Sequence, residues 1–208
     1  MKSSSYLLET DLNVNEIIEN TALVGEYSEK IRNGYTLIVR GVVSQAWCKE
    51  TISYLSQIGR TSLPNYHAIV EGAPNHHRIN RDDPRAYVQG VFHQFSFFPW
   101  NQDLLDLFNT LKSVFVLKNL MNELPGHAFM GTASEDGCIA RLSFQFYPKG
   151  SGYLNFHRDP VDYHQLVIPI MVLTEKGVDF KEGGLRLRCA KRGFDFDADA
   201  MCEPGDIG

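Results

Sequence analysis

The sequence predicts an α+β protein that is mainly β in its C-terminal part, and three observations lead to this prediction. Polar and apolar residues alternate from Arg141 to Tyr147, as in a strand with one buried face. Glycine-rich turns then divide the rest of the chain into short segments. Upstream, apolar residues recur at helical spacing in residues 15–32, 45–58 and 101–121, so we expect helices that support the strands.

The sequence of the N-terminal part predicts a helix, a strand and a second helix. Residues 1–13 form a short polar lead-in, and the first helix covers residues 15–32. A β-branched run over residues 35–43 predicts a strand. Ser44 then occupies the N-cap position of the helix over residues 45–58, where a hydroxyl oxygen can accept a hydrogen bond from a free backbone N–H.

Residues 59–100 are the least regular stretch, because several prolines interrupt it. A long irregular segment inside a compact domain is usually functional. The aromatic-dense run over residues 92–100 is expected to form core or a cavity wall. Asn101 is the expected N-cap of the helix over residues 101–121, and a loop over residues 126–137 leads to the central strand.

Length, composition and charge narrow the class of protein. The chain of 208 residues is 43% hydrophobic and 22% charged, which fits one soluble globular domain. A net charge of −5 weighs against nucleic acid as the principal partner, since phosphate binding needs a basic surface. No apolar run is long enough for a signal peptide or a membrane-spanning helix, so we expect no membrane partner and a cytoplasmic location.

The cysteines support the same location. Cys48, Cys138, Cys189 and Cys202 are widely spaced and include no C-x-x-C pair. We therefore expect free thiols in a reducing compartment. The oligomeric state is not indicated by any pattern in the sequence.

A His-x-Asp pair follows the central strand. After a glycine-rich turn over residues 148–152, a second short strand is expected to end in His157-x-Asp159. Residues two apart in a strand project from the same face, so the imidazole and the carboxylate can bind one metal ion. They are two-thirds of the two-histidine, one-carboxylate triad that holds non-haem Fe(II). We predict His157 and Asp159 as metal ligands and catalytic residues.

The order of motifs around this pair resembles the 2-oxoglutarate/Fe(II)-dependent dioxygenases, and the branches most similar to it are phytanoyl-CoA dioxygenase and prolyl hydroxylase. The resemblance covers residues 34–208, and its specific part is residues 141–208. The motifs that carry it besides the pair are Tyr147-Pro-Lys-Gly150, the segment from Pro169 to Thr174, Glu182-Gly-Gly-Leu185 and Glu203-Pro-Gly-Asp206.

The resemblance implies a double-stranded β-helix (a jelly-roll, cupin-like core) with supporting N-terminal helices. One oxygenase domain would span residues 1–208: residues 1–33 as lead-in and helix, 34–137 as helical support and substrate-covering segment, and 138–208 as the jelly-roll core. In this family a distal His, and an Arg or Lys that binds 2-oxoglutarate, lie just after the Pro-Gly-Asp turn. No histidine follows His164, so we expect the chain to be truncated before them, with C-terminal strands missing.

The resemblance also implies a site for the cosubstrate 2-oxoglutarate. Tyr147 occupies the position of a tyrosine that contacts 2-oxoglutarate in prolyl hydroxylase-like enzymes. The alternative is a half-buried strand tyrosine without this role. Gln145 and Arg141 share a strand face with Tyr147, so they are further cofactor-binding candidates. A strand face turned toward solvent would produce the same pattern.

Substrate contacts are expected in residues 59–100. Arg78 and Arg81 could pair with an anionic group of a small molecule, although a solvated loop with surface arginines explains them equally. His93 is a third candidate, and the alternative is a satisfied core histidine.

The implied function is the hydroxylation of a small polar metabolite by an Fe(II)- and 2-oxoglutarate-dependent oxygenase, with release of succinate and CO2. Asp159 favours hydroxylation, since related halogenases have Gly or Ala at this position. A non-catalytic jelly-roll binding module, or a degenerate oxygenase without a complete metal site, is the alternative. A zinc-dependent hydrolase is disfavoured because the chain contains no H-E-x-x-H motif.

Overall fold

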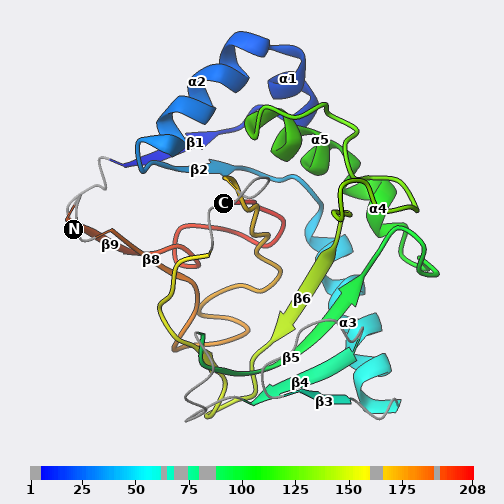
Figure 1. Cartoon of the computed structure of the whole chain (residues 1–208). Coiled ribbons are helices and arrows are strands. Elements are labelled where there is room, and N and C mark those ends of the chain that lie inside the picture. Colours follow the sequence, from blue (N-terminus) through cyan, green and yellow to red (C-terminus); the bar gives the residue numbers. More distant parts are fainter. Residues whose placement is uncertain (1–5, 62–64, 68–74, 80–87, 160–165, 190–192) are drawn as a thin grey trace. The chain divides into compact units, whose positions relative to one another are not determined.

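Figure 1 shows the computed structural model of the chain, with each element labelled. The structure describes residues 6–61, 65–67, 75–79, 88–159, 166–189 and 193–208. They form two compact units. Unit 1 comprises Met1–Ile52, Leu105–Ala128 and Val161–Gly208, and unit 2 comprises Ser53–Leu104 and Phe129–Pro160. The sequence predicted a single oxygenase domain, and this division into two units does not test that prediction.

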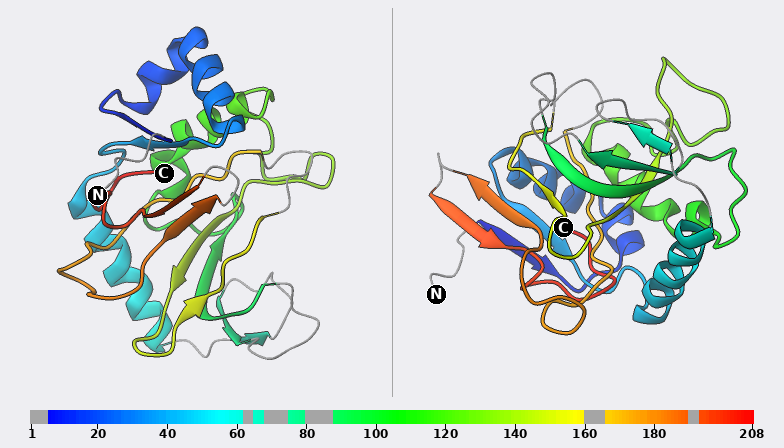
Figure 2. Two further views of the ribbon diagram at one scale, coloured as in Figure 1. Left: turned by 90° about the vertical axis from the view of Figure 1, so that its left-hand side faces the viewer. Right: turned by 90° about the horizontal axis from the view of Figure 1, so that it is seen from below.

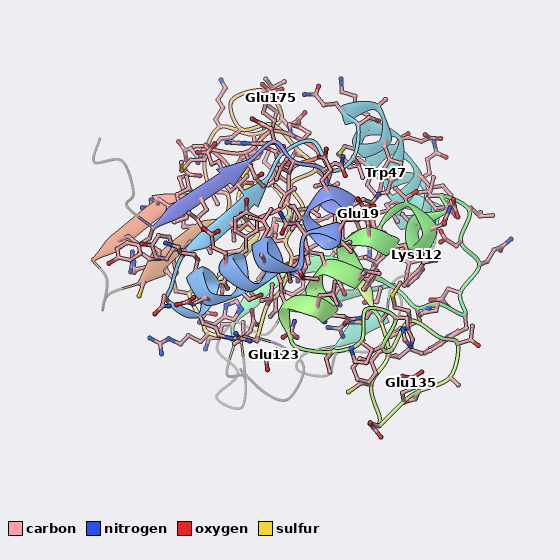
Figure 3. All side chains as sticks on the ribbon, turned by 90° about the horizontal axis from the view of Figure 1, so that it is seen from above. Glu19, Trp47, Lys112, Glu123, Glu135 and Glu175 are labelled. Atoms are coloured by element: carbon pink, nitrogen blue, oxygen red, sulfur yellow. The ribbon has the colours of Figure 1, made fainter. Side chains whose placement is uncertain are left out.

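The core of unit 1 lies between helices and a two-stranded parallel sheet. The elements are β1 (Leu7–Thr10), α1 (Val14–Glu19), α2 (Thr21–Arg32), β2 (Thr36–Val39) and α5 (Lys112–Met121). Figure 3 shows α1, α2 and α5 seen from above, with Glu123 just beyond the C-terminal end of α5. The buried residues that these elements contribute to one cluster are Val14, Ile17, Val24, Leu37, Val39, Leu117 and Met121.

Asn20 divides the helix predicted over residues 15–32 into α1 and α2. Its backbone N–H donates to the Ile17 carbonyl and ends α1, while its side-chain oxygen accepts from the Leu23 N–H at 3.1 Å and caps α2. Asparagine competes with helix propagation in this way because its side chain can replace a backbone acceptor. The prediction of one continuous helix was therefore wrong at this residue.

The C-terminal residues of the chain extend the sheet of unit 1. Ile207 pairs antiparallel with Val39 on one side and with Met171 on the other. The segment around Ile207 therefore lies between β2 and residues 170–172. The expected polar lead-in was also wrong in part, because Leu7–Thr10 form β1 against β2. A strand of four residues with one partner leaves too short a pattern to be read from the sequence.

A buried carboxylate joins these segments. Asp206 is 3% exposed, and its oxygens accept hydrogen bonds from the Gly41 N–H at 2.8 Å, the Glu203 N–H at 2.8 Å and the Arg40 guanidinium at 2.6 Å. Arg40 also bonds to Glu9 at 2.6 Å. Burial opposes the charged form of Arg40, but the hydrogen bonds to Glu9 and Asp206 outweigh it and raise the pKa of the guanidinium.

Unit 2 is built on a five-stranded sheet. Its strands are β3 (Asn65–His67), β4 (Asn75–Ile79), β5 (Gly90–Phe97), β6 (Leu142–Phe146) and β7 (Tyr153–Leu154). The order is β3-β4-β5-β6, and β7 pairs with β5. The two views of Figure 2 show β5 and β6 side by side. The expectation that residues 59–100 are irregular was wrong, since they include β3, β4 and β5, of which the first two are short and polar in sequence.

The predicted order of strand, turn and short strand is confirmed by β6, the turn after it and β7, although β7 ends at Leu154, before His157. Strands β6 and β7 form one line along β5. Phe146 pairs with His93, and Tyr153 pairs with Val91. Both pairings are antiparallel, so the chain runs in the same direction before and after the turn. Residues 147–152 therefore leave the strand opposite Phe92 and return to it without reversing the chain.

The helix predicted over residues 45–58 is confirmed as α3 (Gln45–Thr61), and the Ser44 hydroxyl accepts from the Trp47 N–H at 3.1 Å as its N-cap. The helix predicted from Asn101 begins later, as α4 (Leu107–Thr110), and continues as α5. The Asn101 side chain instead accepts from the Phe98 N–H at 2.8 Å and closes a turn. This local hydrogen bond competes with helix initiation at the same residue.

The last strands form a small antiparallel pair, β8 (Arg186–Cys189) and β9 (Phe194–Asp197). Strand β9 pairs with β8 along its whole length. The motif from Pro169 to Thr174 forms a single β-bridge, at Met171. The strands of the described residues form three small sheets, so the jelly-roll stays a prediction. No helix of the described residues is long and apolar enough to cross a membrane.

Replacing Asp206 by alanine should lower the free energy of unfolding by about 3–5 kcal/mol, because it leaves the partly buried Arg40 without its buried partner. Urea denaturation followed by circular dichroism measures the change. Glu9→Ala is the matched control, since Glu9 pairs with the same guanidinium but is 47% exposed. Exposed pairs contribute about 0–1 kcal/mol, so equal losses in both variants would contradict this assignment.

Candidate functional site

His157 and Asp159 face each other in unit 2. The His157 Nε2 atom lies 3.5 Å from Asp159 Oδ1, and the two side chains are 21% and 55% exposed. The residues do not belong to a strand, because β7 ends at Leu154. The prediction that the two residues project from the same face of one strand was therefore wrong. Their side chains nevertheless point toward each other.

The protonation of the His157 ring follows from its second contact. Its Nδ1 atom lies 2.7 Å from the carbonyl oxygen of Asn155. A carbonyl oxygen only accepts, so Nδ1 carries the proton and donates. In the neutral imidazole, Nε2 then bears the lone pair, and this lone pair lies next to the Asp159 carboxylate. A cation between these two acceptors, which lie 3.5 Å apart, could bind both of them.

This geometry fits two ligands of one metal ion. Nitrogen and oxygen ligands bound at about 2.0–2.2 Å lie about 3.0–3.5 Å apart for bond angles of about 90–110°. The observed 3.5 Å is at the upper end of that range and is longer than a normal N–H···O hydrogen bond. A histidine that donates its other ring N–H to a backbone carbonyl is the usual arrangement of a metal-binding histidine.

The described residues place no third protein ligand with this pair. Within the described part of the chain, no group of three His, Cys, Asp or Glu side chains could hold a metal ion. His164 lies outside the described residues. The cysteines are free, and burial raises the pKa of Cys202 to about 11 and also raises that of Cys48, so these two thiols stay protonated at neutral pH.

The cosubstrate candidates lie along β6. Burial alternates as predicted, with Ser143 and Gln145 exposed and Phe144 buried. The Tyr147 hydroxyl donates to Gln145 Oε1 at 2.7 Å, and the Tyr147 ring lies 5.8 Å from that of Phe92. The structure therefore brings Tyr147 and Gln145 together. Arg141 is exposed directly before β6.

The substrate candidates are not assembled with these residues. His93 pairs with Phe146 across the sheet, so it projects from the face opposite to Gln145. Its ring lies 4.6 Å from that of Phe95, on the side where α3 approaches at Gly59. The backbone of Arg78 belongs to β4, and Arg81 lies outside the described residues.

The loop between Tyr147 and β7 is closed on itself. The Pro148 carbonyl accepts hydrogen bonds from the N–H groups of Ser151 at 3.3 Å and Gly152 at 2.7 Å. A Cβ atom at Gly152 would lie 2.6 Å from the Pro148 nitrogen, so only glycine permits this approach. The loop thus places the return to β7, and the His157 segment after it, through a backbone contact.

Sequence reasoning missed Asn155, whose carbonyl orients His157. Its backbone N–H donates to the Gln89 carbonyl at 2.9 Å, and its side-chain oxygen accepts from the Gln89 N–H at 3.0 Å. No sequence pattern identifies a backbone carbonyl as a contact.

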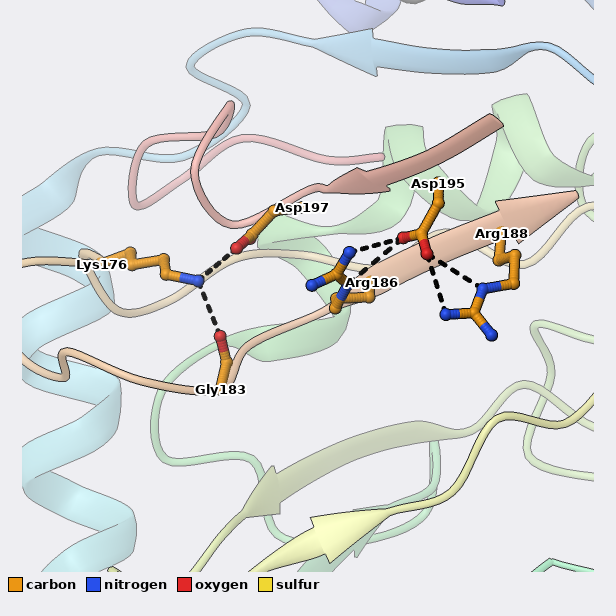
Figure 4. Close-up of polar contacts among 6 residues, drawn as sticks. All are labelled: Lys176, Gly183, Arg186, Arg188, Asp195 and Asp197. Carbon is orange, nitrogen blue, oxygen red and sulfur yellow. Dashed lines mark hydrogen bonds and ion pairs between the residues drawn. The ribbon is translucent and has the colours of Figure 1, made fainter. Parts of the chain in front are cut away.

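A separate polar cluster covers one face of β8 and β9, as Figure 4 shows. Asp195 accepts from Arg186 at 2.7 Å and from Arg188 at 2.8 Å. The hydrogen bonds from Arg186 and then Arg188 lower the pKa of Asp195. Lys176 bonds to Asp197 and to the Gly183 carbonyl. Arg186 and Arg188 therefore have their carboxylate partner, Asp195, within the hairpin itself.

The cavities of unit 1 are separate from the candidate residues. A cavity of about 440 Å³ and one of about 410 Å³ are both open to solvent. Tyr6, Glu29, Lys30, Asn33 and Tyr35 line the first. Neither cavity is lined by a candidate residue.

The comparisons with known proteins add no relative. No protein-family model, no curated protein and no solved structure matches the chain.

Gly152→Ala should lower the free energy of unfolding by about 1–3 kcal/mol, because the added methyl group overpacks the loop against Pro148. Thermal and urea denaturation measure the loss. Gly131→Ala is the control in the same unit, because a Cβ atom there meets nothing closer than 3.9 Å. A Gly152→Ala variant as stable as Gly131→Ala would show that the loop adopts another conformation.

Proposed function

We propose that the protein is an Fe(II)- and 2-oxoglutarate-dependent oxygenase that hydroxylates a small polar metabolite. The proposal combines the resemblance of residues 141–208 to this family with the geometry of His157 and Asp159. Its fold would be the double-stranded β-helix that the resemblance implies.

One observation carries the proposal. The lone-pair nitrogen of His157 and a carboxylate oxygen of Asp159 face each other at 3.5 Å, while the other ring nitrogen is held by the Asn155 carbonyl. A divalent cation would neutralise the carboxylate and satisfy both acceptors at once. This supports a metal centre more specifically than the His-x-Asp spacing alone.

Each residue has a defined task in this proposal. His157 and Asp159 would hold the iron, and the carboxylate of Asp159 favours hydroxylation over halogenation. Tyr147 and Gln145 orient 2-oxoglutarate through the hydroxyl and amide that already bond to each other at 2.7 Å. The bound iron would supply the oxidation by O2, in which 2-oxoglutarate is converted to succinate and CO2 with one oxygen atom of O2, while the other oxygen atom enters the substrate as a hydroxyl group.

The state of the cysteines supports an intracellular setting for this function. All four are free, and Cys48 and Cys202 are buried. Free buried thiols are typical of proteins in a reducing compartment. We therefore propose a cytoplasmic enzyme with a small-molecule substrate and no nucleic-acid partner.

A second candidate is a non-catalytic jelly-roll module or a degenerate oxygenase. It is favoured by the lack of three clustered ligands among the described side chains. Two protein ligands hold a divalent ion less tightly than three. In this case a proton on Nε2, rather than a metal, would join His157 and Asp159.

Anaerobic titration of the chain with Fe(II), followed by calorimetry, should reveal one site per chain. His157→Ala and Asp159→Ala should each weaken the affinity more than about 100-fold, because losing a ligand costs more than losing an outer-shell partner. His127→Ala is the control, since His127 is an exposed histidine of unit 1. It should bind iron as the unaltered chain does.

Succinate release from 2-oxoglutarate by the iron-loaded chain separates the two candidates. An oxygenase should release succinate in an iron-dependent manner, and His157→Ala should abolish it. Iron binding without succinate release would favour the binding module. Equal iron binding by the unaltered chain and His157→Ala would overturn the metal site.

A further inference from the structure

Asn155 makes three hydrogen bonds at the point where the chain leaves the sheet. Two connect it to Gln89: the Asn155 N–H donates to the Gln89 carbonyl at 2.9 Å, and the Gln89 N–H donates to Asn155 Oδ1 at 3.0 Å. The third joins the Asn155 carbonyl to His157 Nδ1 at 2.7 Å. The residue therefore contacts both the end of the sheet and the candidate ligand.

The two bonds to Gln89 replace a regular ladder pair. Leu154 pairs with Gly90, so Asn155 and Gln89 are the next opposite residues of the antiparallel ladder. In a hydrogen-bonded antiparallel pair, each residue gives its N–H to the carbonyl of the other. Here the Gln89 N–H bonds to the Asn155 side chain instead of its carbonyl. The side chain thus takes the place of its own backbone acceptor.

This replacement releases the Asn155 carbonyl to accept from His157. If the side-chain oxygen were absent, the Gln89 N–H would lose its acceptor unless the carbonyl turned back toward it. The cost of leaving a backbone N–H without an acceptor favours that turn. His157 would then lose the acceptor that keeps the proton on Nδ1 and the lone pair on Nε2.

We infer that Asn155 is a positioning residue that sets the tautomer and the orientation of the His157 ring, and through them the affinity for a divalent metal ion. The inference rests on the proposed metal site for its functional consequence. Its structural content, the control of the His157 tautomer by a side chain two residues away, stands on the hydrogen bonds of the described chain. Outer-shell partners of this kind change metal affinity about 10–100-fold.

A purely structural role of Asn155 predicts a different result. In that case Asn155→Ala would lower the free energy of unfolding but leave the His157 ring unchanged. The positioning role predicts a change in the ring nitrogens and in metal affinity. Asn155→Asp separates the two roles, because an aspartate keeps a side-chain oxygen at the same distance along the chain and should restore the bond to Gln89.

The first test uses the metal-free protein. ¹⁵N NMR of the histidine side chains, at a pH where His157 is neutral, identifies which ring nitrogen carries the proton. The unaltered chain and Asn155→Asp should show protonated Nδ1, and Asn155→Ala should lose this tautomer. His157→Ala assigns the signal. If Asn155→Ala does not fold, Asn155→Leu removes the acceptor while retaining a side chain of similar size.

The second test is an anaerobic calorimetric titration with Fe(II). Asn155→Ala should bind about 10–100-fold more weakly than the unaltered chain, and Asn155→Asp should recover most of the loss. An unchanged tautomer in Asn155→Ala overturns the inference whatever the metal result. If the tautomer changes but no form of the chain binds Fe(II), the positioning of His157 is upheld and the proposed oxygenase fails.

Discussion

The carboxylate of Asp206 is the constraint on which unit 1 depends most. It is buried to 3% exposure and accepts from two backbone N–H groups and one guanidinium. Because these donors come from the end of β2 and from the turn before the C-terminal segment, this side chain adds to the backbone pairing of Ile207 with Val39. Gly205 permits the contact, since a Cβ atom there would lie 2.2 Å from the Val43 carbonyl.

The candidate site of unit 2 is held differently. His157 lies beyond the last residue of β7, so the sheet does not position it directly. Its orientation comes from a backbone carbonyl that the Asn155 side chain makes available. A candidate metal ligand outside a strand can adopt an orientation that the alternation of side chains along a strand does not allow. Its orientation then depends on few hydrogen bonds. This difference explains why a loop residue outside the motif matters to the site.

The spacing of apolar residues predicted the longer helices and strands that have one buried face. α3 and its Ser44 cap, and the alternation along β6, follow directly from the sequence. Local side-chain hydrogen bonds explain other errors, since Asn20 and Asn101 bond to nearby backbone where the apolar pattern continues. At the site, the sequence predicted that His157 and Asp159 converge. It could not predict the Asn155 carbonyl, because every residue carries one and only the fold decides which one is released.

The collinear arrangement of β6 and β7 has a consequence for how this protein can diversify. Residues 147–152 depart from the strand opposite Phe92 and rejoin the same line, so the registers before and after them are each anchored independently on β5. Insertions or deletions near the exposed Lys149 would change the length of this loop without changing the register of β6 or β7 on β5. Evolution can therefore remodel the surroundings of Tyr147 while the His157 segment keeps its alignment.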